Sequence, residues 1–360
     1  MAVTLSRGGP RMQDAYRVLR QRVLSMHPGV PLPPVPALMR ELSVSQVTLD
    51  RACDLLEQQG LIERRRGKGV FAASRLATGE IAIVLSQVNL EPTASPTYVR
   101  QCALLRRRLH EVNAEWTVNV HLGVSRMPGP DFPATLDLLE PAVLPRLRGV
   151  LSFHDLFAVE TRLTQAGVPV VYLGGGPTHG TGAYLDHEQM LRDGIRHLAE
   201  CGCRSVCLLH TRYVGKRPQG QDRTPVAAAT AAECGLAFRD EWLGHEEGGW
   251  SERHGYDLFL RVWDKPEHPD GVLVDDDILC HGVLRAVQEL RLELPRDLRL
   301  VSQASRGFGF PYPRPLSRLE YDLDGCADKA VRLLETLAQG QSPECPVEWV
   351  RATLVKGETT

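Results

Sequence analysis

At residues 32–71 the chain reads LPPVPALMRELSVSQVTLDRACDLLEQQGLIERRRGKGVF, and the spacing of the apolar residues predicts two short helices. Leu38 and Leu42 share one face of the first helix. The stripe that we expect to be buried on the second helix consists of Leu49, Ala52, Leu55 and Leu56. Ser45 stands where its hydroxyl can cap the second helix, by accepting a hydrogen bond from an amide of the first turn. The stretch therefore predicts a helix-turn-helix.

A basic ribbon follows the second helix. Gly60 is expected to end that helix, and residues 61–64 and 70–71 are predicted as two strands. The turn between them, residues 66–69, is Arg-Gly-Lys-Gly, which suits a hairpin tip. Two helices at an angle with a cationic wing can enter a DNA groove and hold the phosphates. We therefore expect this stretch to be the functional head of the chain.

The charge of the chain is divided unevenly. Residues 1–75 hold twelve basic and six acidic residues, a net charge of +6, whereas the remaining thirty basic and thirty-eight acidic residues give −8. A basic head on an acidic body suits docking of the head on a polyanion such as DNA.

Composition and motifs narrow the class of protein further. The sequence has no apolar run that could span a membrane and no apolar signal core, which predicts a cytoplasmic protein. Nine cysteines without an export signal favour free thiols, and Cys201, Cys203 and Cys207 do not have the spacing of a zinc site. No catalytic or metal motif is visible, so we expect neither enzymatic activity nor a cofactor.

Around the head, the pattern predicts three further segments. Residues 1–11 read as a tail, and a helix is expected over residues 12–25. On that helix the apolar side holds Ala15, Val18, Leu19 and Val23, and the opposite side is expected to present Arg17, Arg20 and Arg22. The predicted domains are a winged helix-turn-helix at 1–76, a linker at 77–80 and an effector domain at 81–360.

From Ile81 onward, apolar strands alternate with amphipathic helices. The predicted strands cover 81–86, 116–121, 149–153, 168–173, 184–185, 205–210, 271–275 and 298–302. The predicted helices lie near 96–112, 131–144, 155–166, 187–201, 221–235, 251–264, 277–290 and 324–338. Apolar strands separated by helices indicate parallel sheets covered on both faces. This fold class is α/β, with two doubly wound lobes that meet near residues 186–201 and a cleft between them.

Residues 12–73 resemble the winged helix-turn-helix of the GntR family of bacterial transcriptional regulators. The resemblance rests on the Leu-Pro start, on Leu38-x3-Leu42-Ser-Val44-Ser45-x2-Thr48, on Arg51-Ala52-x2-Leu55, and on Gly60-Leu61-Ile62 leading to the wing. Members usually carry basic residues near the positions of Pro36, Gln46 and Asp50. Their absence here predicts that the wing supplies much of the affinity and that the helix reads an unusual site.

Residues 81–357 resemble the ligand-binding body of the lactose/galactose-repressor family, which is similar to periplasmic sugar-binding proteins. The motifs are Asp186 with 197–202, 204–209, 276–282, 294–297, 315–317 and 354–357. The combination is similar to arabinose-repressor-type GntR regulators. It implies a homodimer on a near-palindromic operator, controlled by a small ligand, most often a sugar.

The candidate DNA-binding residues lie on the second helix and the wing, where side chains can reach bases or phosphates. They are Ser45, Gln46, Val47, Thr48, Asp50, Arg51, Arg64, Arg65, Arg66, Gly67 and Lys68. The plain alternative is that Arg64–Arg66 is only a solvated run of charge.

The candidate effector-binding residues are those expected beyond the carboxyl ends of the strands. They are Tyr98, Asp186, Arg223, Trp250, Asp277 and Gln303. An arginine fork, a carboxylate that accepts from paired hydroxyls, and aromatic rings for stacking suit a saccharide. Each has a structural alternative: Trp250 could belong to the core, and Asp186, Asp276 and Asp277 could cap helices.

The sequence therefore predicts a DNA-binding transcriptional regulator, a repressor by expectation, controlled by a sugar. The alternative is a sugar-binding or sugar-processing protein whose head mediates protein contacts. A head fused to an aminotransferase is disfavoured, because none of Lys216, Lys265, Lys329 and Lys356 stands in a convincing cofactor site.

Overall fold

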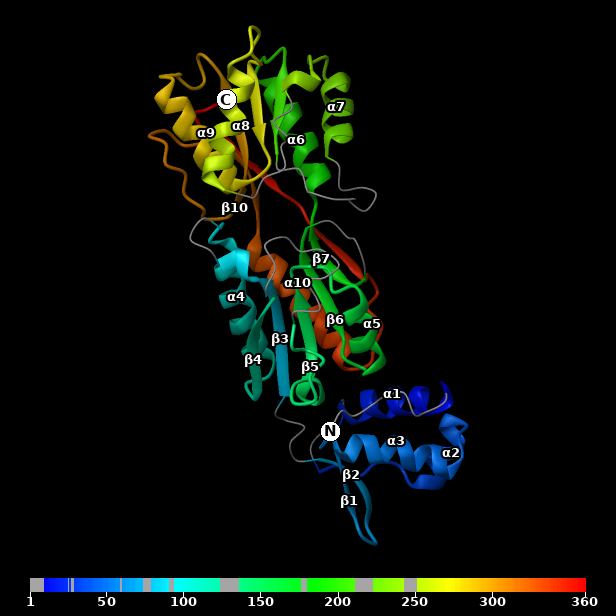
Figure 1. Ribbon diagram of the computed structural model, residues 1–360. Coiled ribbons are helices and arrows are strands. Elements are labelled where there is room, and N and C mark those ends of the chain that lie inside the picture. Colours follow the sequence, from blue (N-terminus) through cyan, green and yellow to red (C-terminus); the bar gives the residue numbers. More distant parts are fainter. Residues whose placement is uncertain are drawn as a thin grey trace.

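The structure is a computed structural model, and it describes residues 10–24, 26, 29–58, 60–73, 79–90, 94–123, 136–175, 180–210, 223–242 and 251–360. Figure 1 shows a helical head at one end, a six-stranded sheet in the middle and a five-stranded sheet at the other end. The two sheets are α/β layers, as the alternation of strands and helices predicted.

The head contains three helices and a hairpin. The elements are α1 (Pro10–Leu24), α2 (Val35–Leu42), α3 (Gln46–Gln58), β1 (Ile62–Arg65) and β2 (Gly69–Ala72), and the two strands are antiparallel. Leu38, Leu49 and Leu56 are fully buried, which confirms the predicted stripes. The Thr48 amide donates to Ser45 Oγ over 3.3 Å, so the expected cap is present. Gly60 has φ +67°, a left-handed conformation that glycine tolerates at a helix end.

The six-stranded sheet has the order β12-β7-β6-β5-β3-β4, and every neighbouring pair is parallel. Its strands are β3 (Gly79–Ser86), β4 (Trp116–Gly123), β5 (Leu147–Ser152), β6 (Val170–Gly174), β7 (Gly182–Leu185) and β12 (Val347–Val350). The accompanying helices are η3 (Gln87–Leu90), α4 (Thr97–Val112), η5 (Leu144–Arg146), α5 (Ala158–Gln165) and α10 (Leu323–Ala338). We call this layer the first lobe.

The five-stranded sheet has the order β13-β11-β10-β9-β8, and we call its layer the second lobe. Its strands are β8 (Val206–Leu209), β9 (Gly271–Val274), β10 (Arg299–Ser305), β11 (Ser317–Tyr321) and β13 (Thr353–Val355). The last strand is antiparallel to β11, whereas the others are parallel. The helices are α6 (His187–Glu200), α7 (Thr224–Glu233), η6 (Asp240–Trp242), α8 (Glu252–Trp263) and α9 (Asp277–Glu289).

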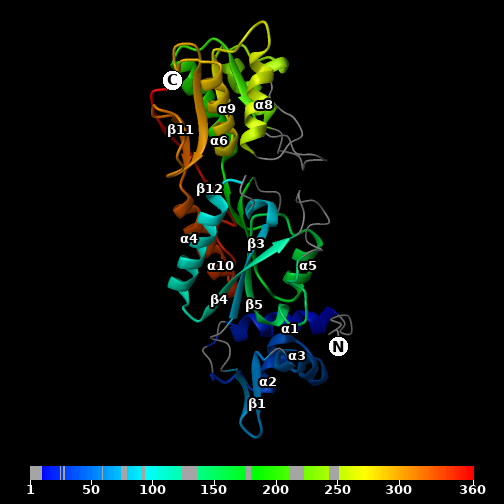
Figure 2. The ribbon, with the colours of Figure 1, turned by 60° about the vertical axis from the view of Figure 1, so that its left-hand side comes forward.

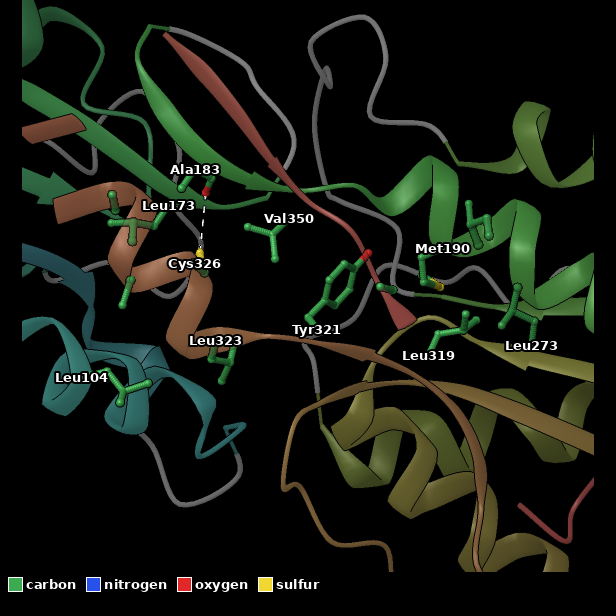
Figure 3. Close-up of a cluster of buried hydrophobic side chains, with 14 of the residues drawn as sticks. Leu104, Leu173, Ala183, Met190, Leu273, Leu319, Tyr321, Leu323, Cys326 and Val350 are labelled. Carbon is green, nitrogen blue, oxygen red and sulfur yellow. Dashed lines mark hydrogen bonds between the residues drawn. The ribbon is translucent and has the colours of Figure 1, made fainter. Parts of the chain in front are cut away.

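The described chain passes between the lobes three times. It leaves the first lobe after Leu185, returns between Tyr321 and Leu323, and leaves again after Val350. Figure 3 shows Tyr321, Leu323 and Val350 packed together at this crossing, within one buried cluster that continues into both lobes. The crossings are also hydrogen-bonded, because the Asp186 amide donates to the Val350 carbonyl over 2.9 Å.

Some local predictions were wrong. No α-helix is present in the described part of the range expected to be helical, 131–144: residues 136–143 precede η5 without helical structure, and Leu144 begins η5. Pro141 and Pro145 disfavour a helix there, since a proline lacks an amide hydrogen and restricts the residue before it. The strands β11, β12 and β13 were not predicted, because their alternating or short apolar pattern gives a weak signal.

Two residues of α1 lie in the opposite environment from the one predicted. Arg20 was expected on the exposed side of the helix, but it is 1% exposed and contacts the first lobe. Val18, expected on the apolar side, is 39% exposed. Figure 2 shows the reason, because α1 lies against the end of the first lobe and therefore packs on two sides.

Candidate nucleic-acid interface and effector site

The amino-terminal part of α3 is an exposed surface of the head. Ser45, Gln46, Val47, Asp50 and Arg51 are exposed, and Thr48 is partly buried. Val47 is 62% exposed, the largest exposed fraction among the large apolar side chains of the described residues. Ser45 Oγ and Thr48 Oγ1 lie 2.9 Å apart, so these two hydroxyls already contact each other.

The four cations of the wing fall into two pairs with different surroundings. Arg64 turns back to α3, where its Nη1 lies 2.6 Å from Asp54 Oδ1 and 3.5 Å from Glu57 Oε2. Arg65 lies 3.3 Å from Glu63 Oε2, and its guanidinium covers the Phe71 ring at 4.5 Å from the centroid. The first pair is therefore committed to the head itself.

Arg66 and Lys68 form the second pair, at the tip of the wing. Both are exposed, and they flank Gly67, whose φ of +72° allows the tight turn between β1 and β2. The Lys68 amide donates to the Arg65 carbonyl over 2.9 Å, which closes the turn. The tip thus projects two positive charges away from the carboxylates of α3.

A polar cluster joins the two lobes, and we call it the interlobe cluster: Ser95, Thr97, Asp277 and Ser305. Thr97 begins α4 of the first lobe, and its Oγ1 lies 2.9 Å from Ser305 Oγ and 3.5 Å from Asp277 Oδ2 of the second lobe. Asp277 is 2% exposed. Its carboxylate also accepts from Ser95 and Ser305. A buried carboxylate surrounded by hydroxyl groups is chemically suited to accept hydrogen bonds from a polyol.

Burial raises the pKa of Asp277, although hydrogen bonds from Ser95 and Ser305 oppose the rise. Burial and the charge of Asp277 also raise the pKa of Asp276. Asp276 is occupied as a helix cap, since its Oδ1 accepts from the amides of Ile278 and Leu279 over 2.9 and 3.0 Å. Of the two neighbouring carboxylates, Asp276 therefore fixes α9 and Asp277 faces the first lobe.

A second group, the arginine cluster, consists of Asp186, His187, Arg223, Asp275 and Tyr321. Arg223 is ion-paired with the buried Asp275. The charges of Arg223, Asp186 and Asp275 all act on the Tyr321 hydroxyl, whose pKa is raised mainly by burial. Burial and Arg223 hold the pKa of His187 well below its usual range, so this imidazole is neutral at pH 7. The cluster thus places one cation, Arg223, and two carboxylates near the neutral side chains of His187 and Tyr321.

The remaining predicted effector residues are Asp186, Tyr98, Gln303 and Trp250. Asp186 caps α6 by accepting from the Gln189 amide over 3.0 Å, as its structural alternative required. Tyr98 packs edge-on against Phe153, with ring centroids 5.7 Å apart. Gln303 is 8% exposed and lies two residues before Ser305 on β10. Trp250 lies outside the described residues.

Several members of the two clusters were not predicted from the sequence: Ser95, Thr97, His187, Asp275, Ser305 and Tyr321. Asp275 and Ser305 lie at the carboxyl ends of β9 and β10, where the strand-end rule would have found them with better boundaries. Ser95 and Thr97 come from the other lobe, 180 or more residues away from Asp277, and no local pattern connects them. Nowhere in the described chain do three or more metal-ligating side chains gather as a metal site would require.

The described residues also contain two hollows away from these clusters. One, of about 510 Å³, is lined along β4 by residues that include His121 and Asp137, and the other lies beside Arg204 and Trp242. Each is an open surface depression with mostly polar walls, unlike the enclosed and mainly apolar sites typical of small ligands. None of the helices in the described ranges is both long and apolar enough to cross a membrane.

Two family models match parts of the chain. Residues 11–72 match the bacterial regulatory proteins of the gntR family, and residues 195–360 match the periplasmic binding protein-like domain. The first match covers the head with α1 to β2. The second begins within α6 and covers the second lobe together with α10 and β12.

Curated relatives are repressors and regulators. The lactose operon repressor of Escherichia coli (strain K12) is 25% identical over 219 residues, which are 58% of this chain and 56% of the relative. The HTH-type transcriptional regulator AglR of Rhizobium meliloti (strain 1021) is 26% identical over 210 residues, 55% of this chain and 56% of the relative. The chain spans about half the length of the curated relatives it matches.

Solved structures show the same fold. A regulatory protein of the LacI family from Chloroflexus aggregans is 19% identical, with a TM-score of 0.63, over 78% of this chain and 98% of its own. The lac repressor dimer bound to operator and an anti-inducer is 20% identical, with a TM-score of 0.63, over 79% of this chain and 94% of its own. A Lactobacillus casei LacI-family regulator with bound glucose has a TM-score of 0.61 at 18% identity, over 79% of this chain and 100% of its own.

Proposed function

We infer that this chain, which joins a GntR-family regulatory domain to a periplasmic-binding-protein-like domain, is a ligand-controlled transcriptional repressor that binds operator DNA as a homodimer. The observation that carries this proposal is the head surface. The exposed start of α3 and the cationic wing tip lie on one small helical domain whose family is that of bacterial regulators. The repressors among the curated relatives support the same function for the whole chain.

In this proposal the division of the chain is 1–76 for the head, 77–80 for the linker and 81–360 for the effector domain. Gln46, Val47 and Arg51 face base edges from α3, and Ser45, Thr48 and Asp50 line the same helix start. Arg66 and Lys68 hold phosphates, with Gly67 forming the turn between them. Arg64 and Arg65 act indirectly. The ion pair of Arg64 with Asp54 fixes the wing against α3, whereas Arg65 pairs with Glu63 within the wing, and both pairs reduce the negative charge near the DNA.

For the effector we propose a neutral saccharide bound between the lobes. Asp277 accepts from sugar hydroxyls, Arg223 donates to them, and Tyr98 offers an aromatic face. Asp186 and Gln303 stand behind this group as orienting residues, and Trp250 stays a sequence prediction. Because Thr97 and Ser305 already connect the lobes over 2.9 Å, a ligand that adds bonds here stabilises the closed arrangement.

DNA binding is tested by selecting duplexes from a random-sequence pool with the full chain. We expect enrichment of a near-palindromic sequence and an affinity that falls steeply with salt concentration. Failure to enrich any sequence, at a salt concentration where the protein is folded and dimeric, refutes the DNA-binding proposal. That result favours the alternative in which the head contacts proteins.

Effector binding is tested by thermal shift against a panel of neutral mono- and disaccharides. The same sugars are then titrated into the complex with the selected operator. A sugar that raises the melting temperature should also change the operator affinity, because coupling between two sites is reciprocal. A stabilising sugar that leaves operator affinity unchanged contradicts ligand control, and an absence of any stabilising sugar contradicts the saccharide assignment.

A further inference from the structure

Arg20 connects the head to the body by a buried contact that the sequence did not suggest. Its Nη2 donates to the Leu147 carbonyl at the start of β5, over 2.9 Å, and its Nη1 donates to the Gly167 carbonyl between α5 and β6. Tyr16, one turn earlier on α1, supplies a further side-chain hydrogen bond. A single guanidinium on a helix of the head therefore contacts two separate segments of the first lobe.

The surface opposite α1 is shaped for this approach. Gly167 has φ +71°, and a Cβ there would lie 3.1 Å from Arg20 Cδ and 3.2 Å from its Nη1. A side chain at this position would both strain the backbone and press on the guanidinium. Gly340, after α10, has φ +75°, and a Cβ there would lie 3.6 Å from Gln21 Cβ. Neighbouring residues of α1 thus lie against three segments at one end of the first lobe.

A second buried arginine opposes this joint. Arg148 is 8% exposed, and its Nη1 shares the Leu147 carbonyl with Arg20 at 3.4 Å. Burial and the charge of Arg20 lower the pKa of Arg148 to about 10. Docking α1 therefore buries two like charges side by side. Their repulsion and desolvation oppose the hydrogen bonds of Arg20, so the contact depends on the carbonyl positions that satisfy the guanidinium.

The joint also lies at the far end of the helix that starts at the crossing between the lobes. Arg148 covers Gly79, the first residue of β3, so the chain enters the first lobe from the linker at this point. Helix α10 begins at Leu323, directly after the crossing between the lobes, and ends at Ala338, beside the turn that contacts α1. Its sixteen residues span about 24 Å. Figures 1 and 2 both show α1 at the end of the first lobe that faces away from the second.

We propose that Arg20 is a positioning residue, which fixes the head on the first lobe and so sets the separation of the two heads in a dimer. The proposal rests on the function inferred above. In the docked state, α3 and the wing tip are exposed, so docking orients the DNA-binding surface without covering it. Helix α10 packs on β5, where a Cβ at Gly149 would lie 2.6 Å from Leu334 Cδ1, so displacement of α10 would alter the position of the Leu147 carbonyl that Arg20 requires. Loss of the contact leaves two heads that are intact but no longer held at one spacing.

The test compares spacing selectivity among variants of the full chain. Operators selected with the wild type are rebuilt as single half-sites and as pairs whose spacer is changed by up to five base pairs, half a turn of DNA. The wild type should lose on the order of tenfold in affinity at the least favourable spacer, because only one spacing allows both heads to bind. Arg20→Met should lose less than about threefold across the series. All variants should bind a single half-site equally.

Two further variants make the comparison specific. Arg17→Met removes an exposed arginine from the same helix, where it pairs with Asp14 over 3.1 Å, and should keep the wild-type spacing profile. Arg20→Lys keeps the charge but cannot hold both carbonyls with one planar fork, and should give an intermediate profile. It also replaces Arg20→Met in the comparison if that variant does not fold.

The outcomes separate this inference from the proposed function. If Arg20→Met keeps the wild-type spacing profile while binding a half-site normally, Arg20 does not position the head. Small-angle X-ray scattering of the DNA-free proteins provides a readout without an operator, and the radius of gyration should rise for Arg20→Met and not for Arg17→Met. Identical scattering overturns the inference. A wild type that enriches no DNA refutes the proposed function instead, while scattering still decides the joint.

Discussion

The wing tip allows a quantitative prediction about DNA affinity. Arg66 and Lys68 are exposed, whereas Arg64 and Arg65 are paired with carboxylates of the head. We predict that replacing Arg66 and Lys68 together by alanine removes two phosphate contacts from each head. The fold of the head should be unchanged, because neither side chain belongs to its buried cluster.

The size of the effect follows from counterion release. Each lost phosphate contact lowers the slope of log affinity against log salt by about 0.9, so one head on a half-site should lose about 1.8. At 0.15 M salt this corresponds to roughly a thirtyfold loss of half-site affinity. If all four wing cations bound phosphates equally, these two would account for only half of the wing's contribution to the slope.

Fluorescence anisotropy with a labelled half-site, between 0.05 and 0.3 M salt, measures both quantities. The matched control is Arg106→Ala with Lys265→Ala, which removes two exposed cations from the body and changes the net charge equally. The control should keep the wild-type slope. A double wing variant with an unchanged slope, or a control that loses as much, refutes the assignment of phosphate contacts to the tip.

Three other perturbations test the body of the protein. Asp277→Asn removes a buried carboxylate of raised pKa, so thermal melting at pH 8 should show equal or greater stability. The rise in melting temperature caused by a sugar should disappear in this variant. A retained rise contradicts the role of Asp277 in binding the sugar. Burial lowers the pKa of His154 to about 4. Between about pH 6.5 and 4, therefore, this imidazole binds a proton in the unfolded chain but not in the folded one. The free energy of unfolding should fall by about 1.4 kcal/mol per pH unit as the pH decreases through this range. His154→Gln, which retains a donor for Asn89, should reduce this fall in urea titrations, and an equal fall excludes His154 as its source. Gly282→Ala should destabilise the second lobe by at least about 3 kcal/mol in chemical unfolding. The reason is that the added Cβ would lie 1.8 Å from the backbone oxygen of Glu252 on the adjoining helix. A variant of near-wild-type stability contradicts this packing.

The local parts of the fold were predictable from the sequence. Leu38, Leu49 and Leu56 repeat with helical spacing, and Ser45 and Gly60 mark the ends of α3, so each signal lies within a few residues of the feature it predicts. The alternation of apolar strands and helices likewise predicted two parallel sheets. Such patterns succeed because burial of one face is decided by neighbours in the sequence.

The joints between parts were not predictable in the same way. Arg20 looked like a solvated charge because its partners, Leu147 and Gly167, are 127 and 147 residues distant. Thr97 was missed because its role depends on Asp277 and Ser305 of the other lobe. In these cases the sequence shows the chemical group, but only the packing of distant elements shows what it contacts.

The three chain segments that join the lobes have a mechanical consequence. A single connecting segment would leave the second lobe free to rotate about several axes. Here the segments after Leu185 and Val350 are tied by the Asp186–Val350 hydrogen bond, and Tyr321 and Leu323 pack beside them. Such a bundle resists twisting more than bending, so the relative motion of the lobes is confined to few degrees of freedom. Under the proposed function, effectors of different shape would then drive one common displacement, and the strength of the response would depend on how much more tightly each one binds the displaced arrangement than the starting one.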